Sequence, residues 1–421
     1  VMSAPQVIVL ADDLTGAADS GVMFANHGLR TMVFWSRPAR SSEDPGARAV
    51  PPTDARVISS ESRECERTEA VRRVRQCVRQ YLQSSVEVWI YKKIDSTLRG
   101  HPGAELAALM EEGGYTRALV APAFPSQGRT TIGGVHRVHG VRLDKTVFGE
   151  DGIDAEVTSH FAGAFGPAAV ATLPLQVIRR GDEAISDALD ATGARAIVAD
   201  AETMEDLIAL VRAAQRSGIR LLCGSAGLAG ALGRTMDWQA LVPSPAFSNP
   251  EGDLILVVAG SRHPSTRDQV LALMARGVPV AAPPPEWFTD PASSTDAVLH
   301  GLRGQPGGSG PSVAAVTTVG LPAMPGEGSR LARKLAEVAR DLVEVGRLAG
   351  LVLTGGDTAI AVANGLEAEA LWLRGEVRSG VPWGVWVGGP GAGLPVVTKA
   401  GGFGEDDTLI AAVDHLRTLF R

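Results

Sequence analysis

Cysteine is scarce in this sequence, which has Cys65, Cys77 and Cys223 and no others in 421 residues. No two of them stand in the Cys-x-x-Cys spacing of zinc and redox motifs, and an odd number cannot pair off completely into disulfides. The sequence therefore argues against a disulfide framework and against a zinc site, and it favours a reducing compartment.

Long apolar runs are also absent. No stretch approaches the roughly 18 residues that a membrane-spanning helix requires. The beginning of the sequence lacks the basic residues followed by an apolar segment that mark a secretory signal. We therefore expect a cytoplasmic location.

Positive charge is in deficit, because the formal net charge is −7. Proteins that bind nucleic acid usually present a basic face, so we expect no nucleic-acid partner. The arginine-rich stretch 63–79 does not change this, since Glu64, Glu66 and Glu69 alternate with its arginines. The alternation is typical of the solvated side of an amphipathic helix, with the exception of Arg63, which follows a predicted strand.

Two common nucleotide signatures are missing as well. The sequence contains neither the GxxxxGK[ST] P-loop nor the GxGxxG fingerprint of dinucleotide-binding folds. This absence argues against a nicotinamide-dependent dehydrogenase. A nucleotide, if the protein binds one, must occupy a less common type of glycine-rich site.

Glycine and proline are plentiful, with 49 and 26 residues, and many of the glycines follow apolar runs. A chain of 421 residues exceeds the about 100–200 residues of a typical domain. The stretch 241–250 carries three prolines in a polar setting, which is typical of a linker. We therefore predict an N-terminal domain over residues 1–242, a linker over 243–251 and a C-terminal domain over 252–421.

Short apolar runs alternate with helical stretches along both halves. Strands are predicted at 7–10, 30–35, 55–58, 86–91, 118–121, 196–199, 220–223, 254–259, 313–317 and 350–353. Helices are predicted at 17–26, 64–82, 104–112, 204–216, 330–346 and 407–420. Alternation of this kind predicts the α/β class, with two three-layer domains, mostly parallel sheets and the active site in the cleft between the domains.

Ligands of open parallel sheets bind beyond the carboxyl ends of the strands, where Asp12 and Asp13 follow the first predicted strand. Two adjacent carboxylates repel each other and need a compensating partner. One of them could cap the following helix. Alternatively, one could deprotonate a substrate hydroxyl or bind a metal ion. A phosphatase-like Asp-x-Asp site does not fit, because the two aspartates are adjacent.

A basic loop follows the strand predicted to end at Tyr91. Lys93, Asp95, Ser96 and Arg99 belong to this loop, which also contains Lys92. Arginine offers a two-pronged donor to a carboxylate and lysine offers a point charge, so the loop predicts an anion site. A solvated turn is the alternative. Arg63 follows another strand and could join the same pocket.

Two further loops carry weaker signals. The loop 121–130 has polar groups suited to a sugar-like ligand, although a merely structural loop is almost as good an interpretation. In the second half, Gly260 and Ser261 lead from a strand into a helix, where the helix N-terminus attracts anions.

The strongest nucleotide signal is the run Gly355, Gly356, Asp357 and Thr358, together with the later glycines of 401–404. Paired glycines after a buried strand allow a backbone to approach a phosphate closely. Asp357 could help to hold Mg²⁺, which usually takes one or two carboxylates together with phosphate oxygens.

As a set, the stretches 11–16, 92–100, 260–261, 355–358 and 401–404 resemble the four-carbon acid sugar kinase family, over nearly the whole chain. The resemblance implies an ATP-dependent kinase of threonate, erythronate or 3-oxo-tetronate, with a sugar-acid domain followed by an ATP domain. It implies that Asp12, Arg63 and the loop 93–99 hold the substrate. It likewise implies that Ser261, Gly355 to Thr358, Gly401 and Gly404 meet the nucleotide.

Within this family, Lys-Ile-Asp-Ser-Thr-Leu-Arg-Gly at 93–100 is similar to the threonate and erythronate kinases, whereas 3-oxo-tetronate kinases carry a Cys-Ser-Thr-Phe-Asp version. The resemblance therefore favours D-threonate. One departure is Ser-Glu-Ser-Arg at 60–63, where Thr-Asp-Ser-Arg is the family form; the arginine is retained.

The expected mechanism combines the chemistry of these residues with what the family resemblance implies. Arg63, Lys93 or Arg99 would bind the substrate carboxylate, and Asp12 or Asp13 would accept the proton of a terminal hydroxyl as the γ-phosphoryl group of ATP arrives. Glycine amides and Mg²⁺ would offset the phosphate charge. A non-catalytic sugar-acid sensor is the rival from another class, and a homodimer is left open.

Overall fold

The computed structural model describes residues 5–35, 52–82, 88–149, 152–240, 251–290, 292–302, 310–322, 324 and 326–420. The chain divides into two compact units, Val1–Pro243 and Ser244–Arg421. The proline-rich stretch 241–250 lies outside the described residues. Among the helices that are described, none has the length and apolar character needed to cross a membrane.

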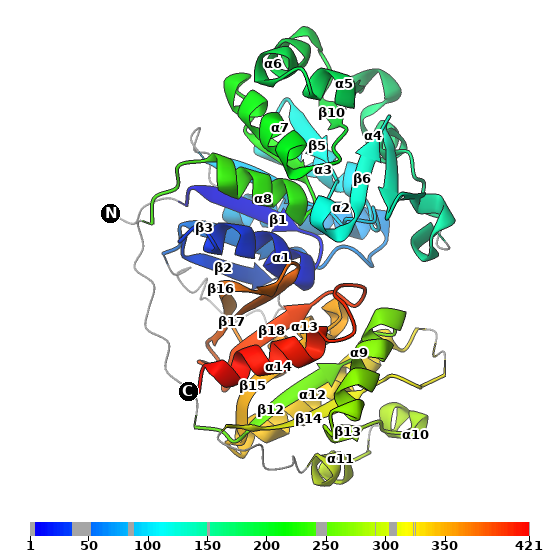
Figure 1. Ribbon diagram of the computed structural model, residues 1–421, viewed down its shortest axis with the longest axis vertical. Helices are drawn as coiled ribbons and strands as arrows, with labels where there is room; N and C mark the ends of the chain where they lie inside the picture. The colour runs from blue at the N-terminus through cyan, green and yellow to red at the C-terminus, as the bar shows by residue number, and fades with distance from the viewer. Residues whose placement is uncertain are drawn as a thin grey trace. The chain divides into compact units, whose positions relative to one another are not determined.

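The N-terminal unit is built on parallel strands in the order β2-β3-β1-β4-β11-β5-β10-β9. Figure 1 labels β1, β2, β3, β5 and β10 of this sheet. The strands are β1 (Val7–Ala11), β2 (Thr31–Trp35), β3 (Ala55–Ser59), β4 (Trp89–Lys93), β5 (Ala118–Ala121), β9 (Val170–Leu173), β10 (Ala196–Ala199) and β11 (Leu221–Gly224). Every residue of β1 is buried, as expected for an apolar strand covered on both faces.

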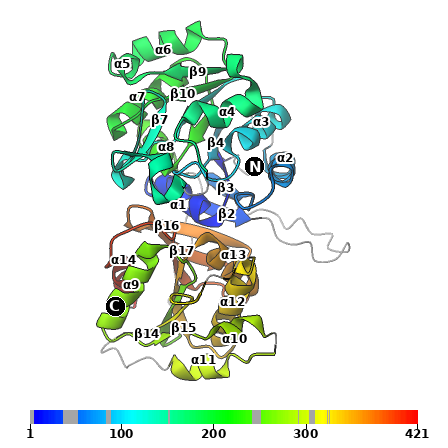
Figure 2. The ribbon, with the colours of Figure 1, turned by 90° about the vertical axis from the view of Figure 1, so that its right-hand side faces the viewer.

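Helices cover this sheet on both faces (Figure 2). They are α1 (Leu14–Ala25), α2 (Arg67–Tyr81), α3 (Pro102–Gly113), α4 (Val157–Phe165), α5 (Leu175–Ile178), α6 (Asp182–Ala191), α7 (Met204–Arg216) and α8 (Ala226–Thr235). Helix α3 packs between α2 and α4, whereas α8 packs between α1 and α7. Ile8 and Leu10 of β1 join the core beneath α2, α3 and α4. A small antiparallel sheet, β6 (Arg129–Ile132), β7 (Val135–Val138) and β8 (Val141–Arg142), follows β5.

The C-terminal unit has the strand order β13-β14-β12-β15-β18-β17-β16. Its strands are β12 (Leu254–Ala259), β13 (Val280–Ala281), β14 (Ser312–Thr317), β15 (Leu348–Thr354), β16 (Ala370–Arg378), β17 (Val381–Val387) and β18 (Pro395–Lys399). Strands β13, β14, β12, β15 and β18 run parallel, and β17 and β16 continue antiparallel.

Helices also flank the sheet of this unit. They are α9 (Pro264–Ala275), α10 (Pro285–Thr289), α11 (Asp296–Gly301), α12 (Gly328–Glu344), α13 (Gly356–Gly365) and α14 (Thr408–Thr418). Helix α12 packs on α13, and α9 packs on α14. Val270 and Leu273 of α9 and Leu409 of α14 share one core cluster with Ile255 and Val257 of β12.

The predicted α/β class with mostly parallel sheets is confirmed in both units. Some element boundaries differ from the predictions. Lys92 and Lys93 are the last two residues of β4, whereas the strand was predicted to end at Tyr91. Asp357 and Thr358 lie in the first turn of α13, a helix that was not predicted. Strands β16, β17 and β18 were not predicted.

Strand register brings the loops of each unit to one edge. Ala11 of β1 pairs with Ser59 of β3, and Leu10 pairs with Lys92 of β4. The segments that follow these residues therefore start side by side. In the C-terminal unit, Thr354 of β15 pairs both with Ala259 of β12 and with Lys399 of β18, so three more loops start together there.

The close approach of α3 and α4 makes a first prediction. A methyl group at Gly103 in α3 would lie 2.0 Å from the His160 carbonyl oxygen of α4, whereas a methyl group at Gly163 in α4 meets nothing within 4 Å. We expect Gly103→Ala to lower the free energy of unfolding by about 1–3 kcal/mol through overpacking. Gly163→Ala is the matched control and should raise it by about 0.5–1 kcal/mol. Urea unfolding of both variants checks this, and equal effects of the two substitutions would contradict it.

Candidate active site

Arg63, in the loop after β3, lies between the two aspartates that follow β1. Its Nε donates to Asp12 Oδ2 and its Nη2 to Asp12 Oδ1, both at 2.9 Å. Its Nη1 and Nη2 donate to the two carboxylate oxygens of Asp13, both at 2.7 Å. All three side chains are nearly inaccessible to solvent. Arg63 is therefore the compensating partner that two adjacent buried carboxylates require.

The two aspartates differ in the hydrogen bonds that they make besides those with Arg63. Asp13 is the N-cap of α1, where it accepts hydrogen bonds from the Gly16 amide at 2.8 Å and from Thr15 Oγ1 at 2.6 Å. Asp12 has no part in the cap. Burial alone would raise the pKa of Asp12, but the charge and hydrogen bonds of Arg63 hold that pKa below its ordinary value, with a smaller contribution from Lys93. The helix-cap alternative therefore applies to Asp13.

Asp95, in the basic loop, joins the same cluster. Arg99 donates to both oxygens of Asp95, at 2.9 and 3.1 Å, and Arg63 Nη2 lies 3.7 Å from Asp95 Oδ1. Thr97 donates to Asp95 through its amide and its hydroxyl. Burial favours a raised pKa for Asp95, yet the charges of Arg99 and Arg63 keep the pKa well below its usual value. The structure thus brings Arg63, Asp95 and Arg99 together, as the sequence predicted.

Lys93 lies against this cluster with its ammonium uncommitted. The residue is 3% exposed. A methyl group at Gly16 would lie 2.8 Å from Lys93 Nζ, 2.5 Å from Asp13 Oδ1 and 3.3 Å from Arg63 Nη2, so a side chain there would displace these groups. Within the described part of the chain, Nζ of Lys93 makes no hydrogen bond and no ion pair within 4 Å.

Lys92 points to the other face of the sheet and has a different role. Its Nζ lies 2.8 Å from Glu105 Oε2 of α3, and both side chains are buried. Burial favours a lowered pKa for Lys92, but Glu105 and Asp12 raise it. Consecutive residues of a strand face opposite sides, which explains why only one of the two lysines reaches the aspartate cluster.

His136 of β7 is a neighbour of the site that the sequence did not reveal. Its Nε2 donates to the Ser96 carbonyl at 2.8 Å, and its Nδ1 lies 3.0 Å from Thr131 Oγ1. Burial lowers the pKa of His136 to about 4, so the imidazole is neutral near pH 7. His136 thereby fixes Ser96, whose own side chain is buried, within the basic loop.

In the C-terminal unit, three predicted segments converge on Ser261. A methyl group at Gly355 would lie 3.3 Å from Ser261 Cβ, and one at Gly401 would lie 2.0 Å from Ser261 Oγ. Gly355 has φ +101° and caps α13 without a side-chain hydrogen bond. The first turn of α13, Gly356 to Thr358, therefore starts beside Ser261, and the N-terminus of a helix attracts anions.

Gly404 ends the glycine loop with φ +78°, and a methyl group there would lie 2.3 Å from Thr408 Oγ1. These close approaches explain why positions 401 and 404 of this loop carry glycine. Asp357 is exposed in the first turn of α13. No group of three potential metal-binding side chains is found among the described residues.

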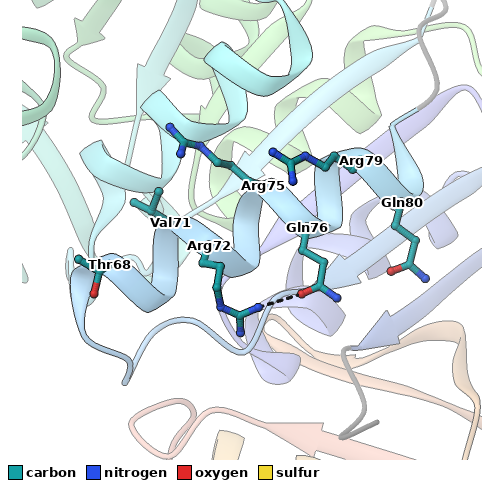
Figure 3. A pocket seen from close by; sticks show the side chains of 7 residues that line it. All are labelled: Thr68, Val71, Arg72, Arg75, Gln76, Arg79 and Gln80. Atoms are coloured by element: carbon teal, nitrogen blue, oxygen red, sulfur yellow. Dashed lines mark hydrogen bonds between the residues drawn. The ribbon is translucent and has the colours of Figure 1, made fainter. Parts of the chain in front are cut away.

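A pocket of about 590 Å³ lies along the outer side of α2, away from these residues (Figure 3). It is lined by Thr68, Val71, Arg72, Arg75, Gln76, Arg79 and Gln80. Its arginines pair with Glu69, Glu111 and Glu112. This agrees with the interpretation of the stretch 63–79 as a solvated helix face.

Comparison with known proteins decides the family. A model of a sugar-binding N-terminal domain matches residues 7–232, and a model of a nucleotide-binding C-terminal domain matches residues 256–409. The D-threonate kinase of Salmonella typhimurium is 34% identical over 439 residues, covering 99% of each chain. The chain belongs to the four-carbon acid sugar kinase family. The resemblance drawn from the motifs is thereby confirmed.

More distant relatives agree with this assignment. The D-erythronate kinase of Heliobacterium modesticaldum is 30% identical, with 98% of this chain and 97% of the relative covered. The 3-oxo-tetronate kinase of Brucella melitensis is 26% identical, with coverage of 94% and 93%. A crystal structure from Salmonella typhimurium LT2 shares the fold, with a TM-score of 0.77 at 22% identity and coverage of 96% and 98%. The chain is therefore a kinase.

The buried Arg63 of this kinase makes a second prediction. Arg63→Gln leaves buried carboxylates without their partner, so we expect a loss of about 3–5 kcal/mol of unfolding free energy at pH 7. In the wild type, the lowered pKa values of Asp12 and Asp95 stabilise the fold above the ordinary aspartate pKa of 3.8, and this contribution is lost as the pH falls through the lowered values.

In the Arg63→Gln kinase the direction reverses, because burial alone raises the pKa of Asp12 and the folded state then takes up a proton more readily than the unfolded state. The stability of Arg63→Gln relative to the wild type should therefore rise as the pH falls from 7 to 5, because the contribution of His136 is common to both proteins. Denaturant midpoints at several pH values check this. Arg79→Gln, which removes an exposed pair with Glu112, is the control and should change little. Parallel pH profiles of the wild type and Arg63→Gln would contradict the prediction.

Proposed function

We propose that this kinase transfers the γ-phosphoryl group of ATP to the terminal hydroxyl of D-threonate, giving 4-phospho-D-threonate. The higher identity to a D-threonate kinase than to the erythronate and 3-oxo-tetronate kinases supports this choice. So does the Lys-Ile-Asp-Ser-Thr-Leu-Arg-Gly form of residues 93–100. D-Erythronate is the second candidate, because that sequence form is common to both kinds of kinase.

The observation that carries the proposal is the uncommitted ammonium of Lys93 beside the ionised carboxylate of Asp12. A buried ammonium that makes no hydrogen bond and no ion pair within 4 Å among the described residues attracts an anion strongly, since little water screens it. The carboxylate of a sugar acid supplies that anion. Arg99, whose side chain is 39% exposed, is placed to add a second donor from the rim of the cluster.

Arg63 receives a different role from the one expected from the sequence. Four of its N–H groups already point at Asp12 and Asp13. In this proposal Arg63 is a positioning residue that keeps Asp12 ionised and oriented, and the substrate carboxylate is left to Lys93 and Arg99. Asp13 is committed to the cap of α1, which favours Asp12 over Asp13 as the base.

The reaction requires little covalent chemistry from the protein. The terminal hydroxyl oxygen forms a bond to the γ-phosphorus, the bond from that phosphorus to the β,γ-bridging oxygen breaks, and ADP leaves with the electron pair. Asp12 accepts the hydroxyl proton. The low basicity of an ionised aspartate suits a loose transition state, in which the proton leaves late and orientation matters most.

The C-terminal unit would hold the nucleotide, with Ser261, the first amides of α13, Gly401 and Gly404 around the phosphates. Asp357 fits a role in binding Mg²⁺, because its exposed carboxylate stands beside amides that attract phosphate. The metal would offset the charge of the phosphate oxygens. The meeting of the two half-sites in a cleft, the homodimer and the cytoplasmic location stay predictions from the sequence.

A third prediction concerns Asp12. Asp12→Asn removes the proton acceptor, so we expect kcat with D-threonate to fall by about 10²–10⁴-fold. A coupled ADP-release assay with Mg-ATP and D-threonate, D-erythronate and 3-oxo-tetronate measures this and identifies the substrate. Asp144→Asn, at an aspartate paired with Arg142 away from the cluster, is the matched control. Full activity of Asp12→Asn would exclude Asp12 as the base, and turnover of D-erythronate alone would reassign the substrate.

A fourth prediction concerns Lys93. Loss of a charge-assisted hydrogen bond costs about 1.5–3 kcal/mol, so Lys93→Met should raise KM for the sugar acid about 10- to 100-fold while leaving KM for ATP unchanged. Lys145→Met, at an exposed lysine, should change neither constant. If Lys93→Met altered KM for ATP instead, the assignment of Lys93 to the carboxylate would fail.

A further inference from the structure

Lys399, the last residue of β18, is buried beneath the glycine loop of the C-terminal unit. It is 1% exposed. Its Nζ donates to the carbonyl oxygens of Ala400 at 3.0 Å, Gly401 at 3.1 Å and Phe403 at 3.1 Å. An ammonium has three N–H donors, so the three carbonyls use all of them.

The direction of these carbonyls decides the direction of three amides. In a trans peptide the C=O of one residue and the N–H of the next point in opposite directions. The carbonyls bound by Lys399 belong to the same peptide groups as the amides of Gly401, Gly402 and Gly404. These three glycine amides therefore point away from Lys399.

Other side chains support the same orientation. Thr266 Oγ1 of α9 donates to the Gly401 carbonyl at 2.9 Å, and Gln269 Nε2 donates to the carbonyls of Phe403, Gly404 and Glu405. The amides of Gly401, Gly402 and Gly404 make no hydrogen bond to any described residue. Successive amides that point to one side form a concave site for an anion.

We propose that Lys399 is a positioning residue of the nucleotide site, which holds the loop 400–404 with its glycine amides turned toward the phosphates and places a buried positive charge behind them. The inference rests on the proposed function, because it assumes that this loop binds the nucleotide. Lys399 itself touches backbone carbonyls and needs no contact with the ligand.

The charge of Lys399 gives the site a dependence on pH. Burial lowers the pKa of Lys399 to about 7. The charged or titratable side chains on the segments 260–268, 355–358 and 400–407 are Arg262, His263, Arg267, Asp268, Asp357, Glu405, Asp406 and Asp407. Burial is the cause of the lowered pKa of Lys399. A bound triphosphate favours the charged lysine, so the nucleotide should bind with uptake of a proton at pH 8 and more weakly as the pH rises above 7.

The fifth prediction tests this with nucleotide binding alone, by calorimetry with Mg-ATP and full-length protein without sugar acid. Lys399→Met should raise Kd for Mg-ATP at least about 30-fold at pH 7, and the pH dependence above 7 should flatten relative to the wild type. Any pH dependence that comes from ionisation of the nucleotide is the same for the wild type and the variant, so the comparison cancels it. D-Threonate binding should be unchanged. Lys334→Met is the control, because Lys334 is also a buried lysine of this unit, bound to the Ser293 carbonyl and to Glu337 of α12.

The outcomes separate the inference from the proposed function. If the wild type binds no nucleotide, the proposed function fails. If the wild type binds and Lys399→Met keeps its affinity and pH profile, the role of Lys399 is overturned. Should Lys399→Met not fold, calorimetry of the wild type at pH 8 in buffers of different ionisation enthalpy decides, since proton uptake supports the inference and its absence overturns it.

Discussion

The contact of Arg63 with Asp12 and Asp13 is the interaction on which the N-terminal half-site depends. Two carboxylates at the end of one buried strand repel each other and lose their hydration. The guanidinium donates to all four of their oxygens. Asp13 can then cap α1, and Asp12 can stay ionised. Because the N–H groups of Arg63 are directed at Asp12 and Asp13, the proposed function assigns the substrate carboxylate to Lys93 and to the partly exposed Arg99.

Lys92 and Lys399 are both buried lysines at strand ends, but their pKa values are shifted in opposite directions. Lys92 faces the carboxylate of Glu105, which raises the lysine pKa against the effect of burial. Lys399 faces three neutral carbonyls, and burial lowers its pKa to about 7. A full opposite charge offsets the desolvation of an ammonium, whereas carbonyl dipoles offset it only in part. Lys92 therefore keeps its charge near neutral pH, whereas the charge of Lys399 can change there.

Much of the fold and the membership of the site follow from the sequence, because strands of a parallel sheet end at one edge. That rule brings together Asp12, Arg63 and Lys93, and likewise Ser261, Gly355 and Gly401. The partners of each charged group do not follow, since they depend on side-chain packing between residues as far apart as Arg63 and Asp12 or His136 and Ser96. Lys399 was not among the predicted site residues, because its strand, β18, was not predicted. The exact acid, the metal ion and the cleft stay predictions.

The two consecutive lysines at the end of β4 have a consequence for how this protein can change over generations. Lys92 and Lys93 serve opposite faces of the sheet, one in a buried ion pair and the other at the aspartate cluster. A deletion or insertion of one residue within β4 would exchange the faces of all the side chains beyond it. Since both positions carry lysine, a slip by one place would still put a lysine at one of the two positions, but it would put Tyr91 or Ile94 at the other. We therefore expect β4 to tolerate a substitution more readily than the insertion or deletion of a residue.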